Sequence, residues 1–188
     1  MKTPIETEIK LRVENAIKAR ALLRRHGFAV TIPRVFEQNL VLDDEQSSLR
    51  ERGMLLRLRA AGKVITCTFK GREIPGRHKS REEWEFRATD LGACVAVFAA
   101  LGFREAFRYE KFRTEFARDK EPGLMTLDET PIGIFMELEG PARWIDSIAK
   151  TLGFPGTAYI TDSYAKLYES WCETNSIELK DMRFNRSQ

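Results

Sequence analysis

The stretch Ile5-Glu6-Thr7-Glu8-Ile9-Lys10-Leu11-Arg12-Val13 carries a charged side chain at every second position. Alternation with a period of two predicts a β-strand with one apolar face and one charged face. Glu6 and Glu8 share the charged face, where two carboxylates repel each other unless water, a base or a metal ion lies opposite. The same arrangement recurs at Glu83/Glu85 and at Glu137/Glu139. This repetition is the strongest indication in the sequence of what the protein does.

The composition restricts the class of protein. The chain has 188 residues, which is enough for one domain with a substantial core. Charged residues make up 31% of it, yet the net charge of +3 is low for a generic nucleic-acid binder. Three cysteines without metal-type spacing are typical of reduced thiols, and two histidines argue against a histidine-based zinc site. We find no signal peptide and no membrane-spanning run, and expect a cytoplasmic protein.

The order of the predicted elements indicates an α+β protein. We expect helices at 15–26, 90–101, 141–152 and 162–171, and strands at 5–13, 36–42, 55–59, 64–70, 81–87, 109–116, 124–128 and 134–139. Because the strands mostly follow one another directly, the sheet should be largely antiparallel. The basic segment 71–80 is predicted to be a loop. We place the domain at residues 1–172, followed by a polar and poorly ordered tail at 173–188.

A weak internal repeat accompanies the helices. His26-Gly27-Phe28, Leu101-Gly102-Phe103 and Leu152-Gly153-Phe154 each close a predicted helix. Two related halves would explain this echo. Glycine followed by an apolar residue is also a common helix ending, so the pattern leaves both explanations open.

The charged face continues on the later strands. Its further members are Arg57, Arg59, Lys70, Arg81, Glu83, Glu85, Lys111, Arg113, Asp128, Glu137 and Glu139. A solvated sheet face normally mixes hydroxyl and amide side chains with single charges, whereas this face bunches like charges. At 6–7 Å, two like charges repel by roughly 0.6 kcal/mol in water and by more at low dielectric. We therefore favour a ligand-binding face over a plain solvated one.

A ligand that satisfies both signs of charge is a polyanion bound to a metal ion. Arginine forks match phosphate oxygens, and clustered carboxylates suit hard divalent cations such as Mg²⁺ or Mn²⁺. Closing the sheet into a β-barrel with this face inward would concentrate the field and exclude bulk water. The apolar faces would then pack outward beneath the helices. The residues alone thus predict a closed barrel around a metal-bound phosphate chain.

The ordered motifs resemble those of the CYTH superfamily, the triphosphate tunnel metalloenzymes. Glu6-x-Glu8-x-Lys10 resembles the N-terminal signature of this family, and Ser163-Tyr164-Ala165-Lys166-Leu167 its C-terminal helix. The intervening matches are Leu56-Arg57-Leu58-Arg59, Phe69-Lys70-Gly71, Arg81-x-Glu83-x-Glu85, Lys111-x-Arg113, Asp128-Glu129 and Gly133 to Gly140. The match spans residues 5–168. It implies an α+β fold built on a closed antiparallel eight-stranded β-barrel, a tunnel with a charged interior and helices outside.

The resemblance also implies residue roles. It implies that Mg²⁺ or Mn²⁺ is bound by Glu6, Glu8, Asp128, Glu137 and Glu139. It implies that the phosphates are bound by Lys10, Arg57, Arg59, Lys70 and Arg113, that Lys111 assists them, and that Lys166 covers the mouth of the tunnel. Arg81, Glu83 and Glu85 support the site by positioning bases or a second metal ion. Among these residues, Glu6, Glu139 and Lys10 are the candidates for direct participation in catalysis.

Three functions remain open from the sequence. The first is a metal-dependent phosphohydrolase that cleaves a terminal phosphoanhydride of inorganic triphosphate or of an organic or nucleoside triphosphate. The second is a class IV adenylate cyclase, which would form cyclic AMP and pyrophosphate from ATP. Cyclases of this class carry a His-Phe pair before the Glu-x-Glu-x-Lys motif, and this chain lacks it. The third is a non-catalytic polyphosphate or nucleotide sensor, which would need few carboxylates.

The partner expectations follow from these functions. The ligand should be a triphosphate-containing small molecule, with neither a membrane nor a nucleic acid as partner. A homodimer is left open. His78, in the basic loop, is expected to be a surface residue rather than a catalytic one.

Overall fold

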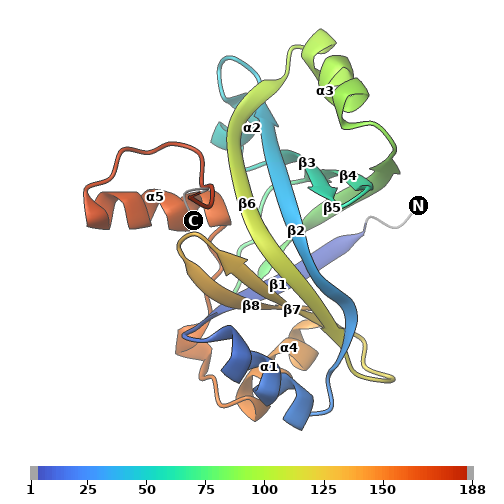
Figure 1. Ribbon diagram of the computed structural model, residues 1–188, viewed down its shortest axis with the longest axis vertical. Helices are drawn as coiled ribbons and strands as arrows, with labels where there is room; N and C mark the ends of the chain where they lie inside the picture. The colour runs from blue at the N-terminus through green and yellow to red at the C-terminus, as the bar shows by residue number, and fades with distance from the viewer. Residues whose placement is uncertain (1–3, 186–188) are drawn as a thin grey trace.

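A closed β-barrel forms the body of the protein (Figure 1). The computed structural model describes residues 4–185; residues 1–3 of the predicted domain and 186–188 of the predicted tail lie outside them. The strands are β1 (Ile5–Val13), β2 (Ala29–Asp43), β3 (Leu55–Ala61), β4 (Val64–Lys70), β5 (Lys79–Ala88), β6 (Arg104–Ala117), β7 (Leu124–Thr130) and β8 (Gly133–Glu139). Their order around the barrel is β1-β5-β4-β3-β2-β6-β7-β8, with every pair antiparallel. The predicted fold class is confirmed.

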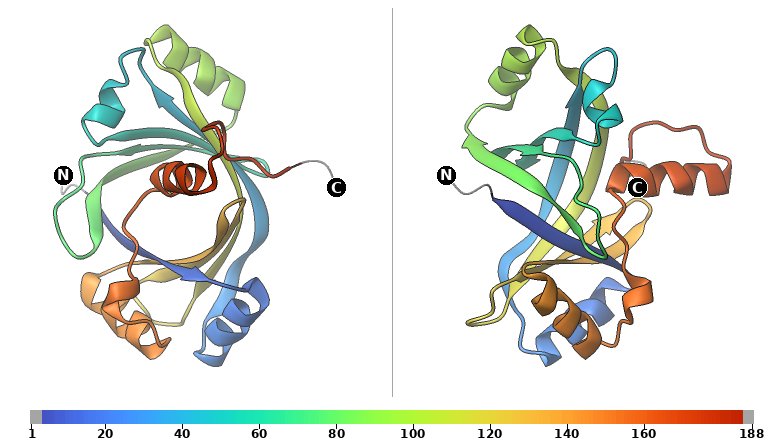
Figure 2. Two further views of the ribbon diagram at one scale, coloured as in Figure 1. Left: turned by 90° about the vertical axis from the view of Figure 1, so that its left-hand side faces the viewer. Right: turned by 180° about the vertical axis from the view of Figure 1, so that it is seen from behind.

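Five helices lie outside the barrel, as expected (Figure 2). They are α1 (Ala16–Arg25), α2 (Ser48–Glu51), α3 (Leu91–Ala100), α4 (Ala142–Thr151) and α5 (Tyr164–Asn175), and a 3₁₀ turn follows α4 at Gly156–Ala158. The four longer helices match the predicted ones. α2 was missed because one turn of helix is too short to show a periodic apolar pattern. It forms because the Asp43 carboxylate accepts hydrogen bonds from the backbone N–H groups of Leu49 and Arg50.

The apolar core lies between the barrel wall and the helices, so the barrel is apolar outside and charged inside. Ile9 and Leu11 of β1 are fully buried in a cluster with side chains of α1 and α4. A second cluster lies beneath α5, and a third beneath α2 and α3. The outward packing of the apolar strand faces is therefore as predicted. It frees the inner face of every strand for charged residues.

The strands β2 and β6 are much longer than the predictions at 36–42 and 109–116. Pro33 and the irregular polar pattern around it concealed the first half of β2. The structure accommodates this segment through register shifts against β6 between Val30 and Ile32 and between Ile32 and Val35. These two long strands pair along most of their length and join the two halves of the barrel (Figure 1).

The repeated Gly-Phe pairs end three helices in the same way. The N–H groups of Phe28, Phe103 and Phe154 donate to the carbonyl five residues earlier, as in a Schellman motif. The topology repeats as well. Apart from the short helix α2 between β2 and β3, the first half (β1-α1-β2-β3-β4) and the second half (β5-α3-β6-β7-β8) have the same order of elements. Exchanging the two halves leaves the strand order of the barrel unchanged apart from its direction. The arrangement supports two related halves, although the third Gly-Phe pair, after α4, has no counterpart.

Residues 173–185 of the expected polar tail first continue α5 and then lie against β6. α5 continues to Asn175, and the chain then returns to the barrel. Met182 is fully buried, and its backbone exchanges hydrogen bonds with Arg108 and Glu110 of β6. The Phe184 ring also packs against Phe112 of β6, with 5.3 Å between the ring centroids, and the polar composition of the segment concealed these two apolar contacts. Within residues 4–185, the structure contains no helix with the length and apolar character needed to span a membrane.

Replacing Gly123 with alanine should destabilise the lower end of the barrel. A Cβ atom at Gly123 would lie 2.4 Å from the Trp144 ring and 2.6 Å from the Glu139 carbonyl oxygen, and Trp144 is itself buried. We expect Gly123→Ala to lower the free energy of unfolding by about 1–3 kcal/mol in urea titrations. Gly76→Ala, where the closest atom is at an ordinary 3.5 Å, is the control. Equal stability of the two variants would contradict the packing described here.

Candidate active site

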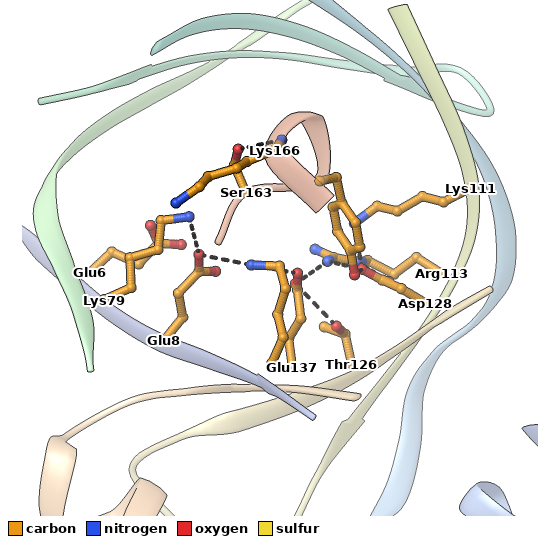
Figure 3. Close-up of polar contacts among 12 residues, drawn as sticks. Glu6, Glu8, Lys79, Lys111, Arg113, Thr126, Asp128, Glu137, Ser163 and Lys166 are labelled. Carbon is orange, nitrogen blue, oxygen red and sulfur yellow. Dashed lines mark hydrogen bonds and ion pairs between the residues drawn. The ribbon is translucent and has the colours of Figure 1, made fainter. Parts of the chain in front are cut away.

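The inner face of the barrel lines a cavity of about 380 Å³. Its charged lining consists of the bases Lys10, Arg57, Arg59, Lys70, Lys79, Arg81, Lys111 and Arg113 and the acids Glu6, Glu8, Glu83, Glu85, Glu115, Glu137 and Glu139. Residues from all eight strands and from the start of α5 meet here, although they are distant in the sequence (Figure 3). The structure brings together all the predicted site residues except Asp128 and Lys166.

The strand order separates the charges into two walls. The three Glu-x-Glu pairs lie on β8, β1 and β5, which are neighbours in the barrel. The two basic pairs, Arg57/Arg59 and Lys111/Arg113, lie on β3 and β6, on either side of β2. These two walls face each other across the cavity. The barrel therefore presents a carboxylate-rich surface opposite an arginine- and lysine-rich one.

Lysines neutralise part of the acidic wall. Lys10 Nζ lies 3.2 Å from Glu8 Oε1 and 3.4 Å from Glu137 Oε1, and Lys79 Nζ lies 3.4 Å from Glu8 Oε1 (Figure 3). Lys70 pairs with Glu6 and, at 3.1 Å, with Glu83. Burial alone would raise the pKa of Glu8, but the lysines, led by Lys10, hold this pKa well below its usual value.

Two other carboxyls of this wall are shifted in the opposite direction. Burial raises the pKa of Glu6 to about 8, even though Lys70 is its partner. Burial also raises the pKa of Glu139 to about 6, and the nearby carboxylates of Glu83 and Glu8 add to this effect. Glu139 faces Glu8 directly in the pairing of β1 with β8. Burial, which penalises the ionised form, thus dominates over the nearby lysines at both carboxyls.

Asp128 does not line the cavity. Its side chain is fully buried, and both oxygens are occupied: Arg113 Nε donates to Oδ1 at 2.7 Å, and Arg113 Nη2 to Oδ2 at 2.6 Å. Oδ2 also accepts from Lys111 Nζ at 2.7 Å and from the Tyr164 hydroxyl at 2.8 Å. A carboxylate bound in this way orients the basic wall and anchors α5. This geometry favours a positioning role over the metal-ligand role that the resemblance implied.

Lys166 also lies outside the cavity. It is exposed on α5, where its Nζ pairs with Asp162 at 2.7 Å. It lines a second, outer cavity of about 680 Å³. This outer cavity shares Lys79, Arg81 and Ser163 with the inner one and is also lined by Met54 and Phe107. Lys166 thus lies beside the entrance of the inner cavity, and the prediction that it covers this entrance stays a prediction.

The structure adds site residues that the sequence analysis missed. Lys79 belongs to the segment 71–80 that was predicted to be a loop, but it is the first residue of β5. Burial lowers the pKa of Lys79 to about 8. Glu37 is buried in the long strand β2, 3.6 Å from Lys111 and 3.9 Å from Arg59. Glu115 and Tyr109 on β6 complete the lining. Extending the predicted strand 81–87 by two residues would have identified Lys79, and the alternation within the predicted strand 109–116 already places Tyr109 and Glu115 on the face of Lys111 and Arg113.

The basic loop is tied down away from the cavity. His78 Nε2 lies 3.0 Å from Asp146 Oδ1 of α4, and the Tyr159 hydroxyl donates to the same oxygen at 2.9 Å. Arg77 lies over the Tyr159 ring. His78 is therefore a half-buried structural contact rather than a free surface residue, and it does not line the inner cavity.

Removing the Asp128 carboxylate should destabilise the whole barrel. Asp128→Ala leaves the buried cations of Arg113 and Lys111 without their main partner, and we expect a loss of about 3–5 kcal/mol in the free energy of unfolding. Asp162→Ala is the matched control, because it removes an exposed partner of a lysine and should change stability by less than about 1 kcal/mol. Urea titrations measure both variants, and similar losses in the two would contradict the anchoring role.

The raised pKa values of Glu6 and Glu139 predict a pH-dependent stability. In the metal-free protein, both groups keep protons at pH values where the unfolded chain has released them. The free energy of unfolding should therefore decrease as the pH rises from about 4.5 towards about 8. Glu6→Gln should make the decrease shallower and end it near pH 6, where Glu139 titrates. Urea titrations with a chelator between pH 5 and 7.5 measure this, and identical profiles for both proteins would contradict it.

Comparisons with known proteins agree with this geometry. The family model of the CYTH domain matches residues 4–151. A Methanocaldococcus jannaschii protein that is provisionally named an adenylate cyclase is 30% identical over 149 residues, covering 79% of this chain and 83% of the relative.

Solved structures with the same fold include a provisionally named adenylate cyclase of Vibrio parahaemolyticus, with a TM-score of 0.78, 19% identity and coverage of 89% of this chain and 99% of that one. A Hippeastrum protein has a TM-score of 0.63, 20% identity and coverage of 93% and 97%. That protein is described as an adenylyl cyclase candidate with a dominant triphosphatase activity. With a family match over most of its length and a charged barrel interior, the chain belongs to the CYTH domain family.

Proposed function

We propose that this protein is a metal-dependent phosphohydrolase that cleaves the terminal phosphoanhydride bond of a triphosphate held inside the barrel. The observation that carries this proposal is the opposition of a carboxylate wall on β8, β1 and β5 to a basic wall on β3 and β6. A phosphate chain bound between them meets guanidinium and ammonium donors on one side and carboxylates on the other. The activity described for the Hippeastrum protein is consistent with this reaction.

The basic wall would bind and orient the phosphates. Arg57 is already directed into the cavity by hydrogen bonds to the Tyr109 hydroxyl at 3.2 Å and to Thr68 Oγ1 at 3.3 Å. Arg113 is fixed by Asp128, so little conformational entropy is lost when it binds a phosphate oxygen. Fixed cations of this kind stabilise the charge that develops on the transferred and leaving phosphates.

The acidic wall would provide the base. Water attacks the terminal phosphorus, the bond from this phosphorus to the bridging oxygen breaks, orthophosphate forms, and the remaining diphosphate leaves, which is free pyrophosphate when the substrate is inorganic triphosphate. Glu139 accepts the proton of the attacking water, because a carboxylate with a pKa of about 6 is mostly ionised at neutral pH and still basic enough for this task. Lys10, held between Glu8 and Glu137, neutralises the same region in the resting protein.

The donor chemistry of the acidic wall fits a divalent metal ion. The carboxylates of Glu6 and Glu8, two residues apart on the inner face of β1, offer the oxygen ligands that Mg²⁺ and Mn²⁺ prefer. Within residues 4–185, no three such side chains already converge on one point. Glu6 and Glu8 would therefore hold the metal after parting from Lys70, Lys10 and Lys79, which leaves Glu139 free to act as the base. Once bound, the metal supplies charge neutralisation at the phosphate oxygens.

A second candidate is an adenylate cyclase. The outer cavity of about 680 Å³ adjoins the inner one, and its lining by Met54 and Phe107 offers apolar surface to a nucleoside next to the phosphate site. The archaeal relative is provisionally named for this activity. In this reaction the ribose 3′-hydroxyl would attack the α-phosphorus, and pyrophosphate would leave.

A substrate panel separates these functions. We expect the purified protein with Mg²⁺ or Mn²⁺ to release orthophosphate from inorganic triphosphate, thiamine triphosphate or ATP, and to form no cyclic AMP. Formation of cyclic AMP and pyrophosphate from ATP would overturn the hydrolase in favour of the cyclase. Binding without turnover, measured by calorimetry, would identify a sensor instead.

Glu139→Gln should lower kcat for the preferred triphosphate by about 10²–10⁴-fold with little change in KM, because it removes a proton acceptor and not a phosphate contact. Glu82→Gln is the control, since Glu82 lies on the exposed outer face of β5. Measurements of kcat and KM at pH 7 test both. Undiminished kcat in Glu139→Gln would exclude Glu139 as the base.

A further inference from the structure

The helix α3 is apolar along its whole length, yet none of its residues is buried. The segment 91–101, Leu-Gly-Ala-Cys-Val-Ala-Val-Phe-Ala-Ala-Leu, contains no charged side chain. Leu91, Cys94 and Phe98 pack against the third apolar cluster on the barrel. The rest of the helix projects from the end of the molecule opposite to α1 and α4 (Figure 1). A surface helix normally carries polar residues on its outer side, and this one does not.

The exposed apolar surface of α3 continues onto the outer face of β5. Phe86 is 57% exposed and pairs with Cys67, which lies in the cluster beneath α3. Trp84, 46% exposed, is the next outward residue of the same strand. Ile5 of β1 lies diagonally across from Trp84, because Ile5 pairs with Glu82. We call this surface the α3–β5 face; its exposed members are Ile5, Trp84, Phe86, Val95, Val97 and Leu101.

The size of the α3–β5 face is that of one side of a stable dimer. Judged from their exposed fractions, its six side chains present on the order of 650 Å² of apolar surface, close to the ~800 Å² that each partner contributes to an interface of standard size. Monomers rarely leave a patch of this size in water.

We propose that two copies of this chain associate through the α3–β5 face. The absence of charge along α3 disfavours a charged partner surface, whereas a second copy brings an equally uncharged helix. A two-fold axis pairs the patch with itself, which requires self-complementarity. The outermost positions of α3 are Gly92, Ala96 and Ala100, so two antiparallel copies of the helix can approach closely, with Val97 and Leu101 packing at the sides. No member of the α3–β5 face lines the inner cavity, and the tunnel stays open in the dimer.

The test is the mass of the full chain in solution. Light scattering after size exclusion, and sedimentation equilibrium between 1 and 100 µM (roughly the range that resolves micromolar dimers), should give about 43 kDa, twice the 21.7 kDa of one chain. The double variant Val97→Glu/Leu101→Glu should raise the dimer dissociation constant by roughly 100-fold or more, because both charges would be buried without partners. Phe86→Glu, on the strand part of the face, should act in the same direction.

Ile17→Glu is the matched control. Ile17 is 76% exposed on α1, at the other end of the molecule, so its replacement should leave the dimer intact (Figure 1). Circular dichroism and thermal melting confirm that each variant is folded. A wild type that is still monomeric at about 100 µM, or a dimer that survives both the double variant and Phe86→Glu, overturns the proposal. Binding of the wild-type monomer to lipid vesicles through the same residues overturns it in favour of a membrane surface.

Discussion

The compensation of buried charge inside the closed barrel is the constraint on which the rest of the structure depends. Asp128 has no solvent contact and accepts hydrogen bonds from Arg113, Lys111 and Tyr164. An unpaired ion at this depth would be strongly destabilising, and Lys10, Lys70, Lys79, Lys111 and Arg113 are each matched to a carboxylate on a neighbouring strand. Because Tyr164 starts α5, the same ion cluster also fixes where the C-terminal helix meets the barrel.

A charged interior requires an apolar exterior, and this inversion explains the placement of the helices. The outward faces of the strands pack under α1 and α4, under α5, and under α2 and α3 in three separate clusters. The hydrophobic effect therefore acts on the outside of the barrel, while electrostatics organise the inside. The arrangement keeps fixed cations and carboxylates in a confined space where their field on a phosphate chain is strong. The outer surface of α3 differs, because it is both apolar and exposed.

Much of the fold and site could be predicted because period-two alternation directly encodes which side chains share a face. The Glu-x-Glu and basic pairs on β1, β3, β5, β6 and β8 all line the cavity, as the alternation indicated. Predictions from a motif were weaker for residues whose role depends on the atoms that contact them in the folded protein. Asp128 shares the inner face, yet its depth beneath Arg113 removes it from the cavity. The first half of β2 was missed because Pro33 and two register shifts interrupt the pattern. Glu37, inside the predicted strand 36–42, was missed because Asn39 and Val41 on the same face carry no charge.

The sequence by itself determined the strands, their inward charges and the membership of the family, because these depend on local alternation and on ordered motifs. Only the tertiary structure decided which strands are neighbours. By placing β8, β1 and β5 side by side and β3 and β6 across from them, barrel closure sorted scattered charges into an acidic and a basic wall. Barrel closure also decided which carboxylates have a lysine or arginine as a partner and which do not. Glu8 and Glu139 face each other only because β1 and β8 close the barrel, and burial and repulsion act between atoms that the sequence leaves far apart.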